Sequence, residues 1–247
     1  MIRVRRTPGG SCLCVPTLAA SGGAYARIPQ VAGLRPTDVT AFSVGAWVYG
    51  TPYFFSSRST AGGETTYAPG VHVRRDHIYL RDNGGGGVIR INLDAVGRTA
   101  GQGWRQIFFT FDGSSSVAGL KAYVDGILAP STAINSDNPS TFAGSDYERI
   151  GGTSSGAGGV LSTAGYIKHV MYFQYKLTAA DVKELRQNAN PADATLSGAG
   201  PYGWWPLDGD GTDLGSGGND IDSVINFVGA AYRNKDTRPM SRVPYAA

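Results

Sequence analysis

Residues 104–113 read WRQIFFTFDG, and after a short loop residues 120–126 read LKAYVDG. In both stretches apolar side chains occupy alternate positions, which places them on one face of an extended chain. These side chains are Ile107, Phe109, Phe111, Leu120, Ala122 and Val124. The dipeptide Asp125-Gly126 then favours a tight turn, because both residues tolerate positive φ. We therefore predict a pair of half-buried β-strands, and this pair decides the fold class.

Short alternating segments recur along the rest of the chain. In residues 42–49 (FSVGAWVY), Phe42 and Val44 fall on one face and Trp47 on the other, so both faces of this strand are expected to be covered. Further strands are expected at 12–18, 25–28, 71–74, 77–81, 89–93 and 166–175. The 36 glycines and 13 prolines suit the many turns between them. This pattern predicts an all-β fold, a two-sheet antiparallel sandwich.

One short helix is expected near residues 178–187. Thr178 is placed to cap its first turn, and Asp181 lies three residues later, as in a capping box. Leu177 and Val182 have the positions of a hydrophobic staple, in which the residue before the cap packs against the helix. These signals predict about two turns of helix.

Composition suggests how the domain is bounded. Residues 1–10 are charged and end in Thr-Pro-Gly-Gly, which predicts a flexible N-terminal arm. A single sandwich domain is expected at 11–228, with a linker-like stretch at 190–201, followed by an extended tail at 229–247. The sequence contains neither a secretory signal nor an apolar run long enough to span a membrane. We therefore expect a protein made in a cytoplasm that has no membrane partner.

The charge pattern argues against nucleic acid as a partner. The formal net charge is only +3, and 17% of the residues are charged. Apart from Arg3, Arg5 and Arg6 at the N-terminus, the basic residues form no cluster or recognisable module. Cys12 and Cys14 are interpreted as reduced thiols in or beside a strand, because a zinc site would need further ligands at suitable spacing.

The carboxylates argue against a glycoside hydrolase. Such enzymes use a pair of carboxyl groups that flank the scissile bond. The chain has only three glutamates, Glu64, Glu148 and Glu184, and no two of them are close in sequence; the one acid two residues from a glutamate is Asp146, beside Glu148. We therefore expect a protein that is not an enzyme.

The three histidines, His72, His77 and His169, do not indicate catalysis either. A serine or cysteine nucleophile would need a histidine and an orienting acid beside it in space. The pattern G-x-S-x-G occurs once, at 152–156 (GTSSG), in a Gly/Ser-rich stretch that no helix is expected to follow, so it is not interpreted as a nucleophile elbow. The segment 75–77 (RDH) is interpreted as a solvated strand edge or turn. His169 lies in an apolar strand and is interpreted as a partly buried histidine whose hydrogen bonds are satisfied.

Five segments occur in the order seen in one known family, and the resemblance spans about residues 21–187. They read GGAYARIP, FSVGAWVYG, GWRQIFFTFDG, LKAYVDGILA and YIKHVMYFQYKLTAADVKELRQ. This order resembles the laminin G-like, concanavalin A-like domains. The resemblance implies a jelly-roll sandwich that ends in a strand followed by a short helix. Members of the family include lectins, adhesion modules, virion proteins and some glycosidases, so the fold implies no single function.

A second resemblance concerns residues 204–224 (WWPLDGDGTDLGSGGNDIDSV) together with Arg238-Pro239. They resemble C-terminal extensions of laminin G-like proteins from bacteriophages and prophages. This implies a structural accessory protein on the virion surface, namely a capsid decoration protein, a head fibre or a tail-associated domain. Its expected partners are other virion proteins of the capsid or tail, and candidate docking residues are Arg3, Arg5, Arg6, Arg238 and Arg242. A homo-oligomer is plausible, because surface-bound accessory proteins follow the symmetry of their support.

A carbohydrate-binding or adhesion module is the alternative function, with a host-surface glycan as partner. Exposed aromatic rings beside polar groups are the usual platforms for a sugar. Candidates are Tyr53, Tyr67, Tyr79 and Trp104. They are equally compatible with ordinary positions on a sheet surface. A glycoside hydrolase is the third and least favoured function.

An acid-rich loop near the C-terminus is the candidate metal site. Asp208, Asp210 and Asp213 supply the oxygen ligands that Ca²⁺ prefers. The loop does not match an EF-hand, because Asp213 stands at the required glycine position and Asn219 replaces the bidentate glutamate. A polar turn is therefore the competing interpretation. No cofactor other than calcium is expected.

Overall fold

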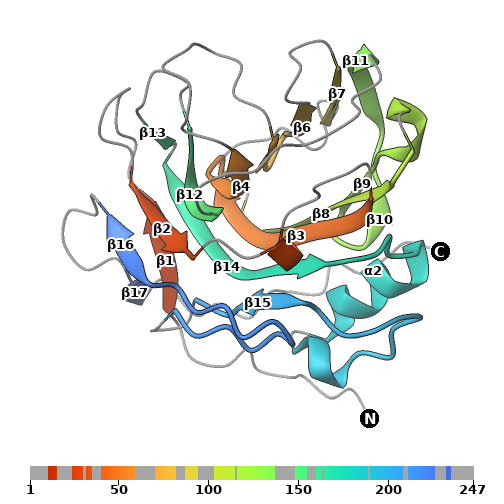
Figure 1. Ribbon diagram of the computed structural model, residues 1–247. Helices are drawn as coiled ribbons and strands as arrows, with labels where there is room; N and C mark the ends of the chain where they lie inside the picture. The colour runs from red at the N-terminus through yellow and green to blue at the C-terminus, as the bar shows by residue number, and fades with distance from the viewer. Residues whose placement is uncertain are drawn as a thin grey trace.

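Two antiparallel sheets lie face to face, and the α-helix α2 (Ala179–Gln187) lies beside one of them (Figure 1). This computed structural model describes residues 11–15, 24–29, 32–34, 40–58, 70–81, 87–93, 103–114, 116–136, 148–154, 160–162, 164–188, 190–207, 211–225 and 232–234. The predicted all-β sandwich with one short helix is confirmed in this part of the chain.

Sheet I has the strand order β10-β9-β8-β3-β14-β1-β17, with β15 paired to β14. Its strands are β1 (Ser11–Val15), β3 (Ala41–Gly50), β8 (Arg105–Asp112), β9 (Lys121–Val124), β10 (Ile127–Leu128), β14 (Gly165–Phe173), β15 (Gly203–Trp205) and β17 (Tyr232–Asn234). The described residues also include three short 3-10 helices, η1 (Ala32–Leu34), η2 (Val117–Gly119) and η3 (Pro191–Asp193).

Sheet II has the order β11-β7-β6-β5-β4-β12-β2-β16, with β13 paired to β12. Its strands are β2 (Tyr25–Ile28), β4 (Tyr53–Arg58), β5 (Gly70–Arg74), β6 (His77–Arg81), β7 (Val88–Leu93), β11 (Ser131–Ser136), β12 (Glu148–Ser154), β13 (Val160–Ser162) and β16 (Ser223–Ile225).

The strand pair predicted from WRQIFFTFDG and LKAYVDG forms the β8–β9 ladder of sheet I. Ile107 lies opposite Val124, and Phe109 lies opposite Ala122. Asp125 and its following glycine both have positive φ (51° and 85°) and turn the chain from β9 into β10. On its other edge β8 pairs with β3, so the segment that decides the fold class lies within the sheet.

The main core lies between the two sheets and is built mostly from alternate side chains of their strands; in β4, where the register shifts, the consecutive Phe54 and Phe55 both contribute. Its fully buried aromatic members come from both sheets, and each contributes about 1.5–3 kcal/mol when it leaves water. They are Phe42, Phe54, Phe55, Phe109, Phe111 and Trp205. The alternation seen in the sequence is therefore the alternation of core-facing and outward-facing positions.

A second apolar cluster covers the other face of sheet I. Phe108 and Phe173 pack there with Leu177, Val182 and Trp204, so that α2 and the segment around β15 close this side. The sequence predicts that both faces of the strand carrying Trp47 are covered, and this is confirmed because the Trp47 side chain is buried. Gly45 stands opposite Phe108, whose ring occupies the space that a Cβ at Gly45 would need. Only glycine fits at this point of β3 without displacing the ring.

Asp181 joins α2 to the segment that follows it. The predicted capping box with Thr178 is present, and the Asp181 carboxylate accepts hydrogen bonds from the Thr178 backbone N–H (2.8 Å) and hydroxyl (2.7 Å). The same carboxylate accepts from the Ser197 backbone N–H and hydroxyl, both at 2.7 Å. Burial acts to raise the pKa of Asp181, but these hydrogen bonds outweigh it and the net shift is downward. The linker-like stretch at 190–201 is thus held against α2.

The ends of the chain are described in part. Residues 1–10 lie outside the described residues, and so does most of the predicted tail at 229–247. Within that tail, β17 pairs with β1. None of the described helices is long and apolar enough to cross a lipid bilayer.

A β-bulge in β14 buries His169. Its φ is 49°, and the register with β3 shifts between Lys168 and Met171. The His169 N–H donates to the Pro206 carbonyl (3.1 Å), while the imidazole stacks on Trp204 at 6.3 Å. The ring is 7% exposed, and its Nδ1 has no hydrogen-bond partner among the described residues. The expectation of a satisfied histidine was therefore wrong for this nitrogen.

Replacing Asp181 with alanine should lower the free energy of unfolding by about 3 kcal/mol, because the cap and the two Ser197 hydrogen bonds are lost together. Urea unfolding measures the change. Asp193→Ala, which removes an exposed carboxylate from the neighbouring η3, is the matched control and should cost much less. Equal losses for the two variants would contradict the role given to Asp181.

Acid should destabilise the fold through His169. Burial, with the charge of Lys168, lowers the pKa of His169 to about 4, whereas the unfolded chain titrates near 6.5. Between these values the unfolded state binds more protons, so the free energy of unfolding falls as the pH falls, by on the order of 3 kcal/mol in total. His169→Asn tolerates the left-handed backbone and does not titrate. Urea unfolding at several pH values should show a smaller acid slope for this variant, and an unchanged slope would refute the assignment.

Candidate functional site

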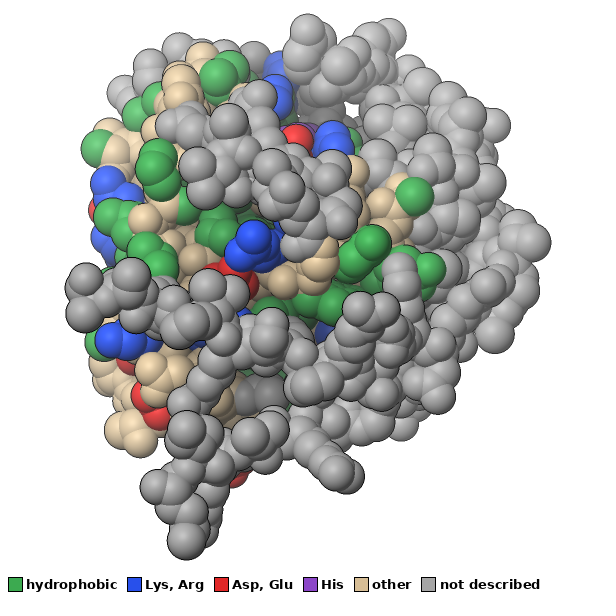
Figure 2. All heavy atoms as spheres, turned by 180° about the vertical axis from the view of Figure 1, so that it is seen from behind, with side chains coloured by type: hydrophobic (Ala, Val, Ile, Leu, Met, Phe, Trp, Pro, Cys, Tyr) green, Lys and Arg blue, Asp and Glu red, His purple; other side chains and the backbone are tan. Residues whose placement is uncertain are grey.

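The outward face of sheet II carries a group of polar and aromatic side chains on three adjacent strands and the edge of β4. On β5, β6 and β7 the core-facing positions are apolar, so the residues between them point away from the core. We call this group the outer-face cluster; it comprises Tyr53, His72, Arg74, Asp76, His77, Tyr79, Arg90 and Asn92. Histidine, acidic and basic side chains also gather at one place near the top of the rear view (Figure 2).

Strand register brings these residues together. His72 of β5 lies opposite Tyr79 of β6, and Tyr79 lies opposite Arg90 of β7. In the neighbouring row, His77 lies opposite Asn92. The β5–β6 hairpin therefore places two histidines, five residues apart in sequence, on adjacent strands of one face.

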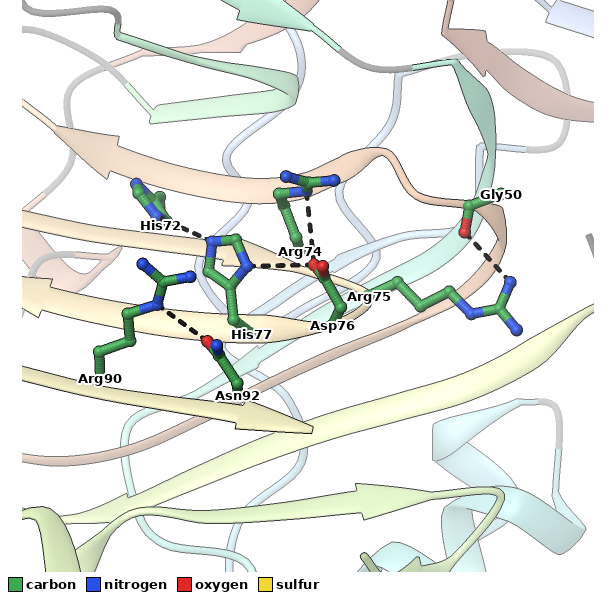
Figure 3. A network of polar contacts seen from close by, with 8 residues as sticks. All are labelled: Gly50, His72, Arg74, Arg75, Asp76, His77, Arg90 and Asn92. Atoms are coloured by element: carbon green, nitrogen blue, oxygen red, sulfur yellow. Dashed lines mark hydrogen bonds and ion pairs between the residues drawn. The ribbon is translucent and has the colours of Figure 1, made fainter. Parts of the chain in front are cut away.

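Asp76 and the two histidines form a chain of polar contacts (Figure 3). The Asp76 Oδ1 lies 3.1 Å from His77 Nδ1, and His77 Nε2 lies 3.2 Å from His72 Nε2. Arg74 Nε lies 3.5 Å from the same Asp76 oxygen. Asp76 thus stands between a guanidinium and an imidazole.

The electrostatics of this chain keep the carboxylate charged and favour a neutral imidazole. Burial alone would raise the pKa of Asp76, but the hydrogen bond from His77 and the charges of His77 and Arg74 lower it to about 2. For His77, burial lowers the pKa and outweighs the opposing effect of Asp76. A neutral imidazole has one nitrogen that donates and one that accepts.

Aromatic rings flank His72 on two sides. Its imidazole stacks on Tyr79 with the centroids 4.8 Å apart and meets the Tyr53 ring edge to face at 5.6 Å. The Arg74 guanidinium lies over Tyr53, 5.1 Å from the ring centroid. Tyr53 is only 9% exposed, whereas Tyr79 is half-buried and presents more of its ring to the surroundings.

Arginines add hydrogen-bond donors next to the rings. Arg90 Nε donates to the Asn92 Oδ1 at 2.9 Å, and Arg81 Nη1 donates to the Tyr79 hydroxyl at 3.3 Å. Guanidinium, amide and imidazole groups beside a half-buried ring can bind a polar ligand through hydrogen bonds and ring contact together. Positive charge exceeds negative charge here, since Asp76 is the only carboxylate of the cluster.

The segment 75–77 is not the solvated turn that the sequence predicts. Arg75 is 1% exposed, and its Nη1 donates to the Gly50 carbonyl of β3, 3.1 Å away (Figure 3). His77 is 7% exposed. The prediction was wrong because Arg75 does not extend into solvent: it reaches from the β5–β6 turn to sheet I.

The four aromatic residues predicted to bind sugar do not come together. Tyr53 and Tyr79 belong to the outer-face cluster, and Tyr67 lies outside the described residues. Trp104 precedes β8 of sheet I, where it lies 6.2 Å from the Tyr49 ring and 6.5 Å from the Tyr166 ring. The sugar-binding assignments remain predictions.

Sequence reasoning missed six members of the cluster as binding candidates, namely His72, Arg74, Asp76, His77, Arg90 and Asn92. For those on strands the signal was available, because they alternate with core-facing residues. The sequence does not show that these residues lie close together, because this depends on β5, β6 and β7 being neighbours in one sheet.

The candidate calcium loop is described only in part. Asp208 and Asp210 lie outside the described residues. The Asp213 carboxylate accepts backbone N–H groups from Trp204 (2.7 Å), Gly215 (2.8 Å) and Asn219 (2.7 Å). No three His, Cys, Asp or Glu side chains in the described ranges are grouped as a metal site. Calcium binding remains a prediction, and the observed contacts of Asp213 organise a loop.

The remaining predicted residues are placed as follows. Glu148 on β12 is buried and accepts from the Ser57 hydroxyl at 3.2 Å, while Glu184 on α2 accepts from Asn188 at 2.7 Å. Glu64 lies outside the described residues. The five candidate docking arginines are also outside them, namely Arg3, Arg5, Arg6, Arg238 and Arg242.

A sequence profile of the concanavalin A-like lectin/glucanases superfamily matches residues 20–183. The chain belongs to this superfamily. The resemblance to laminin G-like and concanavalin A-like domains is thereby confirmed, over nearly the range expected. The phage context attached to residues 204–224 remains a proposal.

Several solved structures are similar to this chain. A protein from Bacteroides ovatus ATCC 8483, named as a candidate carbohydrate binding protein, is 14% identical with a TM-score of 0.52 over 90% of this chain and 61% of that one. The CBM40 of a Ruminococcus gnavus sialidase, bound to α2,3-sialyllactose, is 12% identical with a TM-score of 0.50 over 71% of this chain and 97% of that one. The heptameric SAP-like pentraxin of Limulus polyphemus is 15% identical with a TM-score of 0.46 over 75% of this chain and 84% of that one. For the first two structures, at this identity, the likeness shows the fold alone. No curated protein sequence matches the chain significantly.

Proposed function

We propose that the chain is a non-enzymatic carbohydrate-binding module and that the outer-face cluster is its binding surface. The observation that carries the proposal is the row His72–Tyr79–Arg90, which puts a stacked aromatic pair next to a guanidinium on the outward face of sheet II. A sugar offers an apolar ring face and a rim of hydroxyl groups. In this row, an aromatic ring can contact the apolar face of the sugar, and N–H donors can bind its hydroxyl groups.

The charge of the cluster favours a glycan that carries carboxylate or sulfate groups. Arg90 has Asn92 as its hydrogen-bond partner among the described residues, and this amide oxygen does not neutralise the guanidinium. Arginine binds planar anions through paired hydrogen bonds. The carboxylate of Asp76 is already engaged by Arg74 and His77. An anionic group would therefore lie beside Arg90 with the sugar ring over Tyr79.

The placement of the glutamates supports the non-enzymatic part of the proposal. Glycosidases hold two carboxyl groups about 5–10 Å apart across an open site. Glu148 is buried within the sandwich, and Glu184 lies on α2. Neither belongs to the outer-face cluster, in which Asp76 is the only carboxylate.

Glycan binding can be tested by screening the tag-free protein on a glycan array and measuring the best ligand by calorimetry. Tyr79→Ala and Arg90→Gln should each weaken binding by about tenfold or more, which is about 1.4 kcal/mol. Tyr166→Ala is the matched control, because it removes a half-buried tyrosine from the outward face of sheet I. Absence of any bound glycan would refute the proposal. Loss of binding in Tyr166→Ala alone would move the site to the aromatic group around Trp104.

A role as a bacteriophage virion accessory protein is a second proposal, compatible with the first if the glycan lies on the host surface. It is supported by the resemblance of residues 204–224 to phage proteins. This segment belongs to the fold: β15 pairs with β14, and Trp205 Nε1 donates to the Asn219 carbonyl at 2.9 Å. Docking through the terminal arginines to capsid or tail proteins, calcium binding and homo-oligomerisation belong to this proposal.

The virion proposal predicts that the chain is a component of purified particles from its source. Mass spectrometry and electron microscopy would give its copy number. Tens to hundreds of copies per particle would support capsid decoration, because such proteins follow the capsid symmetry. A few copies would support a tail or fibre position, and complete absence from particles would rule out a virion role.

A further inference from the structure

We propose that His72 and His77 form a binding site for a divalent transition-metal ion such as Zn²⁺, with Asp76 holding His77 in the orientation of a ligand. This inference goes beyond carbohydrate binding, although it uses the same face of sheet II. Among the described residues no group of three His, Cys, Asp or Glu is placed to hold a metal ion together, so the site has two protein ligands. Solvent or a bound molecule would supply the remaining positions.

The distance between the two imidazole nitrogens fits a shared metal ion. The Nε2 atoms of His72 and His77 lie 3.2 Å apart. Zinc binds histidine nitrogen at roughly 2.0–2.1 Å, so two nitrogens at this separation subtend about 100° at the ion. This angle is close to the tetrahedral value that zinc prefers.

The contact between Asp76 and His77 is of the kind that orients histidines in metal sites. Metal-ligating histidines donate their second ring N–H to a carboxylate or carbonyl, which sets the tautomer and the ring orientation. Here Asp76 Oδ1 lies 3.1 Å from His77 Nδ1. With the proton on Nδ1, the Nε2 lone pair of His77 faces His72 (Figure 3). Burial, which lowers the pKa of His77, further favours the neutral, ligating form.

The two rings are held before an ion arrives. His72 is flanked by Tyr79 and Tyr53, and His77 is almost fully buried. Both histidines belong to strands of one hairpin, where Val73 pairs with Ile78. Sites on paired strands hold their ligands in position more precisely than sites on loops. Without an ion, the two rings share one hydrogen bond, in which one Nε2 donates to the other. Binding requires the donating ring to move its proton to Nδ1, so no net proton is lost.

Nearby positive charge selects the kind of ion. Arg74 and Arg90 oppose a cation here, as their effect on the pKa of His77 shows, but Arg74 is paired with Asp76. Calcium and magnesium bind to several oxygen ligands and are held by negative charge. This site offers two imidazole nitrogens and lies beside two arginines, so it does not suit them. Imidazole pairs suit zinc, copper, nickel and cobalt, whose bonds to nitrogen are stronger.

The test uses tag-free, chelator-treated full-length protein titrated with Zn²⁺ alone by calorimetry, with no glycan present. We expect one Zn²⁺ per chain, and loss of this binding in both His72→Ala and His77→Ala. Asp76→Asn should weaken binding 10–100-fold, as other losses of an orienting partner do. Because glycan binding is tested separately with Tyr79→Ala and Arg90→Gln, failure of one proposal leaves the other standing.

Two controls separate this site from other zinc ligands in the chain. His169→Asn removes the third histidine and should leave Zn²⁺ binding unchanged. The double variant Cys12→Ser/Cys14→Ser should also bind normally. Crystals soaked in Zn²⁺ should show anomalous density between His72 and His77, a result that does not depend on whether the alanine variants fold. Absence of Zn²⁺ binding, or binding that survives in both histidine variants, would overturn the proposal.

Discussion

Sheet I must be covered on both faces, and the rest of the architecture follows from this constraint. Its strands are apolar on both sides: Phe109 faces the other sheet, while Phe108 faces α2 and Trp204. The sandwich covers one side only, so the chain needs α2 and the segment around β15 for the other. Asp181 connects those two elements through Thr178 and Ser197. On β5, β6 and β7 of sheet II the outward positions carry polar and aromatic side chains, which can face a ligand there.

Much of this arrangement follows from local sequence patterns. Alternation identifies the strands and their core faces, Asp125-Gly126 marks the turn after β9, and Thr178 with Asp181 marks the start of α2. These features depend on residues that are close in sequence. Alternation does not say which sheet a strand joins. Tyr79 and Trp104 look equivalent in sequence, yet one belongs to sheet II and the other precedes a strand of sheet I.

Arg75 shows a second limit of sequence reasoning. A charged residue in a turn is normally solvated, but the Arg75 guanidinium is buried against β3, where burial and the charge of Arg105 lower its pKa. The negative charges of Asp125 and Asp76 act in the opposite direction and stabilise it there. A buried cation without such neighbours would cost several kcal/mol, roughly the desolvation penalty of an ion. Its place depends on the packing of one sheet on the other, which no local pattern reports.

That buried arginine also affects the outer-face cluster, the proposed binding surface. Arg75 ties the β5–β6 turn to Gly50, and Asp76 and His77 are the next two residues of the chain. The turn cannot move away from sheet I without breaking this contact, so the carboxylate that orients His77 is held at a set height above the sheet. His77 in turn faces His72, whose ring stacks on Tyr79. The order of the outer-face cluster is thus inherited from the inter-sheet packing, and a ligand on this face would meet groups that are already in position. Preorganisation of this kind lowers the entropic cost of binding and would favour a ligand at the proposed site.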